Sequence, residues 1–311
     1  SPRAELAALV DASAEPGKRA ADELGCPFYT DMEELFAREN VDIVDICLPS
    51  FLHERFVLVA AEHRKHVICE KPFALSPESA RRMKEACEKA GVVLMAAQVV
   101  RYMSEYREIR RLIEQGRAGT IRMVSAARLS QHPNWTSWHR DPEKSGGGLF
   151  DLHLHDIDYL YSLFGKVESV SAVGWKSPSG CWNHVVSSLC FANGIRAVAE
   201  GSMEMTGDYP FSAAFRAVGD RATIEYRLSA GFNIENLAAA QSSLVLFEEG
   251  KKPEQIEIPP GDGFQAEIDA FVEALEQGKP SPIDPADSLY VIGIIDALRT
   301  SLETGKSAAP A

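Results

Sequence analysis

The stretch HVICEKP, residues His66 to Pro72, is an apolar run that ends in an acid, a base and a proline. An apolar, β-branched run that reaches a proline predicts a buried strand, because proline lacks an N–H group and restricts the residue before it. Lys71 is thereby placed at the end of a strand, where open α/β sheets bind ligands. A partly desolvated lysine there can serve in proton transfer; the simpler interpretation is a surface Glu-Lys pair in a turn.

Short strands and helices alternate on both sides of this stretch. Ser76-Pro77-Glu78 supplies an N-cap, a proline at the first helical position and an acid in the first turn, and Gly91 ends that helix. Strands are predicted at 5–11, 27–31, 41–49, 66–69 and 92–98, and helices at 15–25, 32–40, 53–63, 77–90 and 104–115. Such alternation predicts a Rossmann-like parallel sheet.

The rest of the chain has a different pattern. Strand-like segments follow one another at 121–129, 167–175, 184–191, 195–205, 211–218, 221–227, 243–248 and 254–258, and two helices are predicted at 264–276 and 284–303. Asn193-Gly194 and Gly219-Asp220 are hairpin signals. We therefore predict an α/β protein of two domains: a Rossmann-like domain over 1–119, and over 120–311 an α+β domain with a large, mostly antiparallel open sheet for substrate binding and oligomerisation.

The composition argues against several classes of protein. The 311 residues are 45% hydrophobic and 25% charged, as in soluble globular proteins, and the net charge of −13 argues against nucleic acid as a partner. No apolar run is long enough to span a membrane, and the opening residues lack the pattern of a secretory signal. The six cysteines form no CxxC pair and are interpreted as reduced core residues, so we expect a cytoplasmic protein.

A second motif is GGGLFDLHLHDID, residues 146–158. Three glycines permit a sharp turn or a close backbone approach, and the segment after them is predicted to be helical as far as Gly165. On a helix, Asp151 and His155 lie four residues apart, with Asp158 one turn further along the same face. An acid beside a histidine that accepts a proton from a hydroxyl is what alcohol oxidation requires, although a helix N-terminal acid and a capped histidine would show the same pattern.

Metal binding is the rival hypothesis for this segment. It would use Asp151, His153, His155 and Asp158 as ligands. The imidazoles of a His-x-His pair on a helix point about 200° apart, so one ion cannot easily reach both. We therefore predict no metal site.

Asp11, at the end of the first predicted strand, suggests a dinucleotide site. An acid at the end of the second strand of a Rossmann domain accepts hydrogen bonds from an adenosine ribose and repels a 2′-phosphate, which predicts NAD, with NADP less favoured. The glycine loop that should precede Asp11 is absent from this chain, and GDGFQA at 261–266 is no substitute, because two prolines precede it and no second parallel strand follows. We expect the functional polypeptide to extend upstream by about 20 to 30 residues that carry a strand and G-x-G-x-x-G.

Taken in order, these motifs resemble the Gfo/Idh/MocA family of glucose-fructose oxidoreductases and inositol dehydrogenases. The resemblance runs over most of the chain: Cys47-Leu48-Pro49 followed by His53, HVICEKP, Gln98 and Arg101, a segment at Trp138, and GGG with D-x-x-x-H-x-x-D. It implies a Rossmann domain followed by a domain with a large open sheet. It also implies an NAD(P)-dependent dehydrogenase that oxidises a hydroxyl of a sugar, polyol or cyclitol.

The resemblance also implies roles for single residues. The catalytic set would be Lys71, Asp151 and His155: His155 accepts the hydroxyl proton, Lys71 stabilises charge on the oxygen, and Asp151 fixes the geometry. The cofactor would lie against Asp11, Leu48, Pro49, His53, Glu70, Lys71 and Gln98, and the substrate against Arg101, Trp138, His139, Arg140 and His153. His153 and His139 depart from the family pattern, which commonly has a small residue and an arginine at these positions.

Two other functions compete with this reading. A non-catalytic regulatory protein of the same fold could bind a sugar or the cofactor, but a pure binder has no need of Lys71, Asp151 and His155 together. A metal-dependent hydrolase ranks third. We also expect a homodimer or homotetramer, because the strands at 185–191 and 195–201 carry apolar residues on both alternations.

Overall fold

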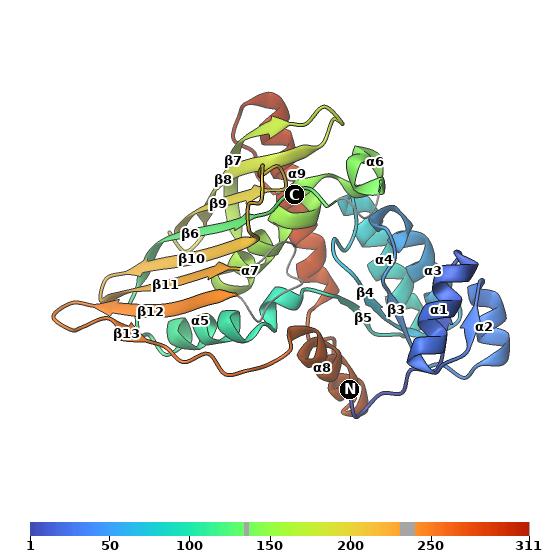
Figure 1. Cartoon of the computed structure of the whole chain (residues 1–311). Helices are drawn as coiled ribbons and strands as arrows, with labels where there is room; N and C mark the ends of the chain where they lie inside the picture. The colour runs from blue at the N-terminus through green and yellow to red at the C-terminus, as the bar shows by residue number, and fades with distance from the viewer. Residues whose placement is uncertain (134–136, 231–239, 311) are drawn as a thin grey trace.

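The computed structural model of the protein describes residues 1–133, 137–230 and 240–310. A small α/β part lies beside a larger part that is built on one eight-stranded sheet (Figure 1). The predicted fold class, a Rossmann-like parallel domain followed by an α+β domain with a large and mostly antiparallel sheet, is confirmed.

The small part alternates strands and helices as predicted. Strands β1 and β2 pair in parallel, and β3, β4 and β5 form a second parallel sheet. The elements are β1 (Leu9–Val10), α1 (Ala14–Leu24), β2 (Phe28–Tyr29), α2 (Met32–Arg38), β3 (Ile43–Ile46), α3 (His53–Glu62), β4 (His66–Cys69), α4 (Pro77–Ala90) and β5 (Leu94–Ala96), with 3-10 turns at Ser50–Leu52 and Val99–Arg101. Helix α5 (Ser104–Glu114) follows them in sequence but packs against the large sheet, where Tyr106 contacts Tyr226.

The helix boundaries follow from local chemistry. Ser76 caps α4 by accepting the backbone N–H of Ser79, and Pro77 occupies the first turn, where a missing N–H costs nothing. Gly91 ends α4 with a φ of +71°, in the left-handed region that favours glycine. Helix α4 joins β4 to β5, which run parallel, so their carboxyl ends lie at the same edge of the sheet.

The large sheet has the strand order β13-β12-β11-β10-β6-β9-β8-β7. Its members are β6 (Ile121–Leu129), β7 (Val167–Lys176), β8 (Trp182–Phe191), β9 (Arg196–Ser202), β10 (Ser212–Gly219), β11 (Ala222–Ser229), β12 (Gln241–Glu248) and β13 (Glu254–Gln255). Neighbouring strands are antiparallel except β6 and β9, which run parallel. The hairpins predicted at Asn193-Gly194 and Gly219-Asp220 join β8 to β9 and β10 to β11.

Helices cover the side of this sheet that faces the small part (Figure 1). Helices α7 (Leu154–Phe164) and α9 (Pro285–Thr304) pack there, and α9 also contacts α4. A 3-10 turn at Trp138–Arg140 and the short α6 (Pro142–Ser145) precede α7. Within the described ranges, none of the helices combines the length and the apolar character that a membrane crossing needs.

Helix α8 (Gly263–Glu276) returns to the small part although it follows the large sheet in sequence (Figure 1). Its Phe271 is fully buried in a cluster with Ile68 of β4 and Met95 of β5. The boundary predicted at residue 119 lies in the loop between α5 and β6. Because α9 contacts both β7 of the large sheet and α4 of the small part, we expect the two parts to move little relative to one another.

Candidate active site

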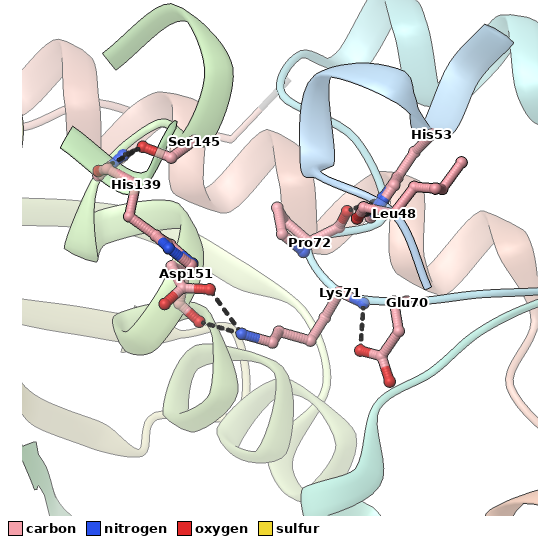
Figure 2. Close-up of polar contacts among 9 residues, drawn as sticks. Leu48, His53, Glu70, Lys71, Pro72, His139, Ser145 and Asp151 are labelled. Carbon is pink, nitrogen blue, oxygen red and sulfur yellow. Dashed lines mark hydrogen bonds and ion pairs between the residues drawn. The ribbon is translucent and has the colours of Figure 1, made fainter. Parts of the chain in front are cut away.

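Lys71 and Asp151 meet where the small part faces the large sheet (Figure 2). Lys71 Nζ lies 2.6 Å from Asp151 Oδ1 and 3.2 Å from the Asp151 backbone oxygen. Burial alone would raise the pKa of Asp151, but the Lys71 ammonium holds that pKa below its ordinary value. The folded chain therefore joins two predicted catalytic residues, 80 positions apart, in an ion pair.

Asp151 is presented by a π-helical turn, Leu149–His153, that runs directly into α7. Gly147 has a φ of +71°, and a Cβ there would lie 2.7 Å from the Cβ of Cys181. The backbone N–H of Gly148 donates to Asn183 Oδ1 at 2.9 Å. The glycines thus let the turn rest directly on the start of β8.

His153 and His155 point in different directions, as two residues on a helix must. His153 is 0% exposed, and its Nε2 lies 2.8 Å from Ser187 Oγ on β8. Burial lowers the pKa of His153 to about 4. The ring of His153 packs against the sheet and is shielded from solvent, and its expected contact with the substrate stays a prediction.

His155 lies on the other side of the helix, near the Lys71–Asp151 pair. Burial, the Lys71 ammonium and the Arg128 guanidinium hold the pKa of His155 well below its ordinary value. The ring is therefore neutral at physiological pH. Its Nδ1 is buried without a hydrogen-bond partner among the described residues.

Arg101 and Asp158 form a second ion pair, further along α7. Arg101 Nε and Nη2 lie 2.7 and 2.6 Å from the two carboxylate oxygens of Asp158, whose side chain is 1% exposed. The guanidinium that we expected to bind substrate is thus held in a bidentate pair, and its contact with a substrate stays a prediction.

The metal hypothesis needs Asp151, His153, His155 and Asp158 to converge. Asp151 faces Lys71, His153 faces Ser187 and Asp158 faces Arg101. Across 1–133, 137–230 and 240–310, no group of three or more His, Cys, Asp or Glu side chains is arranged to hold a metal ion.

His53 is a buried link between two backbone segments (Figure 2). Its Nδ1 lies 2.9 Å from the carbonyl oxygen of Pro72, and its Nε2 lies 2.8 Å from that of Leu48. Burial lowers the pKa of His53, so a neutral ring donates to one of the two carbonyls. Both ring nitrogens lie against the backbone at the ends of β3 and β4, and the expected contact of His53 with a cofactor stays a prediction.

The remaining predicted cofactor residues follow the carboxyl ends of parallel strands. Leu48 and Pro49 come after β3, and Gln98 comes after β5. Glu70, after β4, accepts the backbone N–H of Lys71 at 3.0 Å, and burial raises the pKa of its carboxyl group. Asp11 follows β1 and accepts the backbone N–H of Ser13 at 2.7 Å. Carboxylate acceptors at strand ends fit the ribose hydroxyls of a dinucleotide.

Of the remaining predicted substrate residues, His139 lies beside the ion pair. Its ring stacks on that of Trp138, with the centroids 3.8 Å apart, and Ser145 Oγ donates to its backbone oxygen at 3.0 Å. Burial lowers the pKa of His139, although Asp151 opposes that effect. The side chain of Arg140 is exposed.

Two residues of this region escaped the sequence analysis. His132, in the loop after β6, lies close enough to Asp151 and His139 to lower the pKa of both groups. Glu267 on α8 is 3% exposed, and its burial together with Glu70 and Asp45 raises its pKa to about 8. The sequence offered one signal for each residue. His132 is a histidine just after the end of a strand, and Glu267 is an acid on the buried face of a helix.

Comparison with known proteins finds relatives in sequence and in fold. D-xylose 1-dehydrogenase (NADP(+)) 2 of Haloferax volcanii is 28% identical over 305 residues, which cover 97% of this chain and 90% of that protein. A 2,7-anhydro-N-acetylneuraminate hydratase of Mediterraneibacter gnavus is 37% identical over 175 residues, 55% of this chain and 46% of the relative, so that match spans about half of each. The fold is similar to that of an aldose-aldose oxidoreductase from Caulobacter crescentus complexed with glycerol, with a TM-score of 0.85, 23% identity and coverage of 98% and 91%.

Two family models divide the chain between them. The oxidoreductase family model with an NAD-binding Rossmann fold matches residues 1–98, and the C-terminal domain model of the same family matches residues 106–225. These are the residues that carry Lys71 in the first model and Asp151 with His155 in the second. The chain belongs to the Gfo/Idh/MocA family of oxidoreductases.

Proposed function

We propose that this protein is a nicotinamide-dependent dehydrogenase that oxidises a hydroxyl of a sugar, polyol or cyclitol. The observation that carries the proposal is the ion pair of Lys71 and Asp151 at 2.6 Å, with the neutral ring of His155 next to it. A pure binding protein has no need to bury a lysine, a carboxylate and a neutral imidazole together, because each has a desolvation cost.

The geometry suggests a role for each side chain. Two of the three ammonium hydrogens of Lys71 are directed at oxygens of Asp151, which leaves the third to donate to a substrate oxygen. Asp151 fixes the position of the ammonium group. The Nδ1 atom of His155 is buried although the residue as a whole is partly exposed, and we assign Nε2 as the ring atom that exchanges a proton with that oxygen.

The cofactor residues proposed here are Asp11, Leu48, Pro49, Glu70, Lys71 and Gln98, at or near the carboxyl ends of β1, β3, β4 and β5. When bound, a nicotinamide dinucleotide supplies the hydride acceptor for the oxidation. NAD is proposed over NADP because of the Asp11 carboxylate, and both are assayed because one relative is named for NADP(+). A cytosolic location is proposed from the six cysteines, all of which are free thiols.

A substrate panel tests the proposal. Sugars, polyols, inositols and anhydro sugars are each mixed with the protein and NAD or NADP, and cofactor reduction is followed by absorbance at alkaline and neutral pH. Anhydro sugars are included because one relative is named as a hydratase of such a compound. The proposal predicts reduction with at least one polyhydroxylated compound and little or none with the Lys71→Met variant. Equal rates from both proteins, or no reduction by either, would contradict it.

A further inference from the structure

His132 lies in the loop after β6, outside every motif that marked the active site. His153 is hydrogen-bonded to Ser187 on the sheet, and His155 lies within range of the Lys71 charge. His132 lies within electrostatic range of Asp151 and His139, and Asp151 is also the ion-pair partner of Lys71. His132 is therefore near the proposed catalytic residues.

The hydrogen bond of His132 to the backbone determines which of its ring nitrogens carries the proton. Nδ1 lies 2.8 Å from the carbonyl oxygen of Pro133, and a carbonyl oxygen can only accept. Nδ1 must therefore be the N–H donor. A neutral imidazole has one N–H group, so Nε2 then carries no hydrogen and can only accept a hydrogen bond, through its lone pair in the ring plane.

That acceptor has no donor among the residues that the structure describes. Nε2 of His132 is buried and has no hydrogen-bond partner among the described residues. Asp151, the neighbouring acid, is held ionised by Lys71 and is itself only an acceptor, so it cannot donate to this nitrogen. A buried acceptor without a donor is costly, and such groups in an active site commonly await a ligand.

We propose that His132 is a substrate-binding residue whose Nε2 accepts a hydrogen bond from a second hydroxyl of the substrate, next to the hydroxyl that Lys71 contacts. This inference rests on the proposed dehydrogenase function and deepens it. It selects vicinal diols, as found in sugars and cyclitols, over simple alcohols. It also disfavours a carboxylate at that position, because an anion offers no donor to a bare imidazole nitrogen.

Two variants separate binding from structure. His132→Phe keeps a ring of similar size and removes the acceptor, whereas His132→Gln can place an amide oxygen where Nε2 lies. With the best substrate of the panel, we expect His132→Phe to raise KM about tenfold or more with a smaller change in kcat, and His132→Gln to stay within about threefold of the wild type. His63→Phe is the matched control: His63 lies on α3 beside Phe36 and Glu33, and this change should leave KM unaltered.

A series of deoxy analogues identifies the hydroxyl. With the wild type, each analogue that lacks a bound hydroxyl should have a lower kcat/KM than the parent substrate. For one analogue, this decrease should disappear in His132→Phe, because the analogue and the variant remove the same hydrogen bond. An unchanged KM in His132→Phe, or equal KM changes in the Phe and Gln variants, would overturn the assignment. The same holds if every deoxy penalty persists in His132→Phe.

The ring nitrogens give a readout that needs no turnover. The 15N chemical shifts of histidine-labelled protein distinguish the Nδ1–H from the Nε2–H form, and we expect His132 in the Nδ1–H form at neutral pH. An Nε2–H ring in an active enzyme would refute the His132 proposal alone. A panel without any cofactor reduction would refute the dehydrogenase function and leave the tautomer result standing.

Discussion

Lys71 Nζ lies 2.6 Å from Asp151 Oδ1, so a single largely buried ion pair ties the end of β4 to the turn before α7. The pair joins the part of the chain that matches the NAD-binding model to the part that matches the C-terminal domain model. The Lys71 ammonium lowers the pKa of the Asp151 carboxyl group although burial acts in the opposite direction. A substrate oxygen placed against Lys71 therefore meets an ammonium group that is already oriented.

Replacement of the proposed catalytic groups should act mainly on turnover. We expect Lys71→Met, Asp151→Asn and His155→Ala each to lower kcat by about 100-fold or more, since charge-stabilising and proton-transfer groups act on the transition state. Steady-state kinetics with the best panel substrate, beside circular dichroism of each variant, measures this. Normal turnover in both Lys71→Met and His155→Ala would show that the assigned chemistry is wrong.

Asp11 should set the cofactor preference. Asp11→Ser removes the carboxylate that repels a 2′-phosphate, so we expect the ratio of kcat/KM for NADP to that for NAD to rise by about tenfold. Asp22→Ser, on the exposed face of α1, is the matched control and should leave the ratio unchanged. A wild-type protein that already prefers NADP would contradict the assignment.

His153 should contribute to the pH dependence of stability and not to substrate affinity. Its pKa is about 4 in the folded chain and about 6.5 when unfolded, so between these values the unfolded state binds a proton that the folded state does not. Stability therefore falls as the pH drops from about 6.5 to 4, by about 3 kcal/mol for this group.

The His153→Gln variant should lack the part of the low-pH loss of folding stability that His153 causes. Urea unfolding of both proteins at pH 7 and pH 4.5 measures the difference, because other titrating groups contribute equally to each. KM should stay close to that of the wild type. A large rise in KM with an unchanged pH slope would restore His153 to the substrate site.

Arg101→Met should destabilise the fold strongly. It leaves the almost fully buried carboxylate of Asp158 without its bidentate partner, which costs about 3 to 5 kcal/mol. Arg82→Met breaks the exposed pair with Glu54 and should cost about 1 kcal/mol or less. Chemical denaturation of both variants provides the comparison, and equal losses would mean that Arg101 does not act through Asp158.

Self-association is expected through the face of the large sheet that lies opposite α7 and α9. Val173 and Trp175 of β7 are 71% and 52% exposed on that face, beside Val186 of β8. Apolar side chains in a row on an open sheet favour burial against a second copy. Light scattering at micromolar concentration should give a dimer or tetramer, and Trp175→Asp should shift it toward monomer; a monomeric wild type would refute this.

The sequence by itself determined the elements and the family. The strand HVIC appears as β4 at the predicted residues, and the Ser76 cap and Gly91 stop define α4, because strand periodicity and helix capping depend on residues that are neighbours in the chain. The hairpins at Asn193-Gly194 and Gly219-Asp220 were predictable for the same reason. The ordered set of motifs was enough to indicate the Gfo/Idh/MocA family.

Only the tertiary structure decided which side chains meet. His153 and His155 look equivalent in the sequence, yet His153 packs on Ser187 and His155 lies near Lys71. The difference arises because the π-helical turn before α7 packs on β8 and so fixes which side chains face the sheet. Two other arrangements likewise join segments that are distant in the chain: the position of His132 near Asp151, and the ion pair of Arg101 with Asp158. Such contacts follow from the packing of whole elements against each other, and local sequence patterns do not specify that packing.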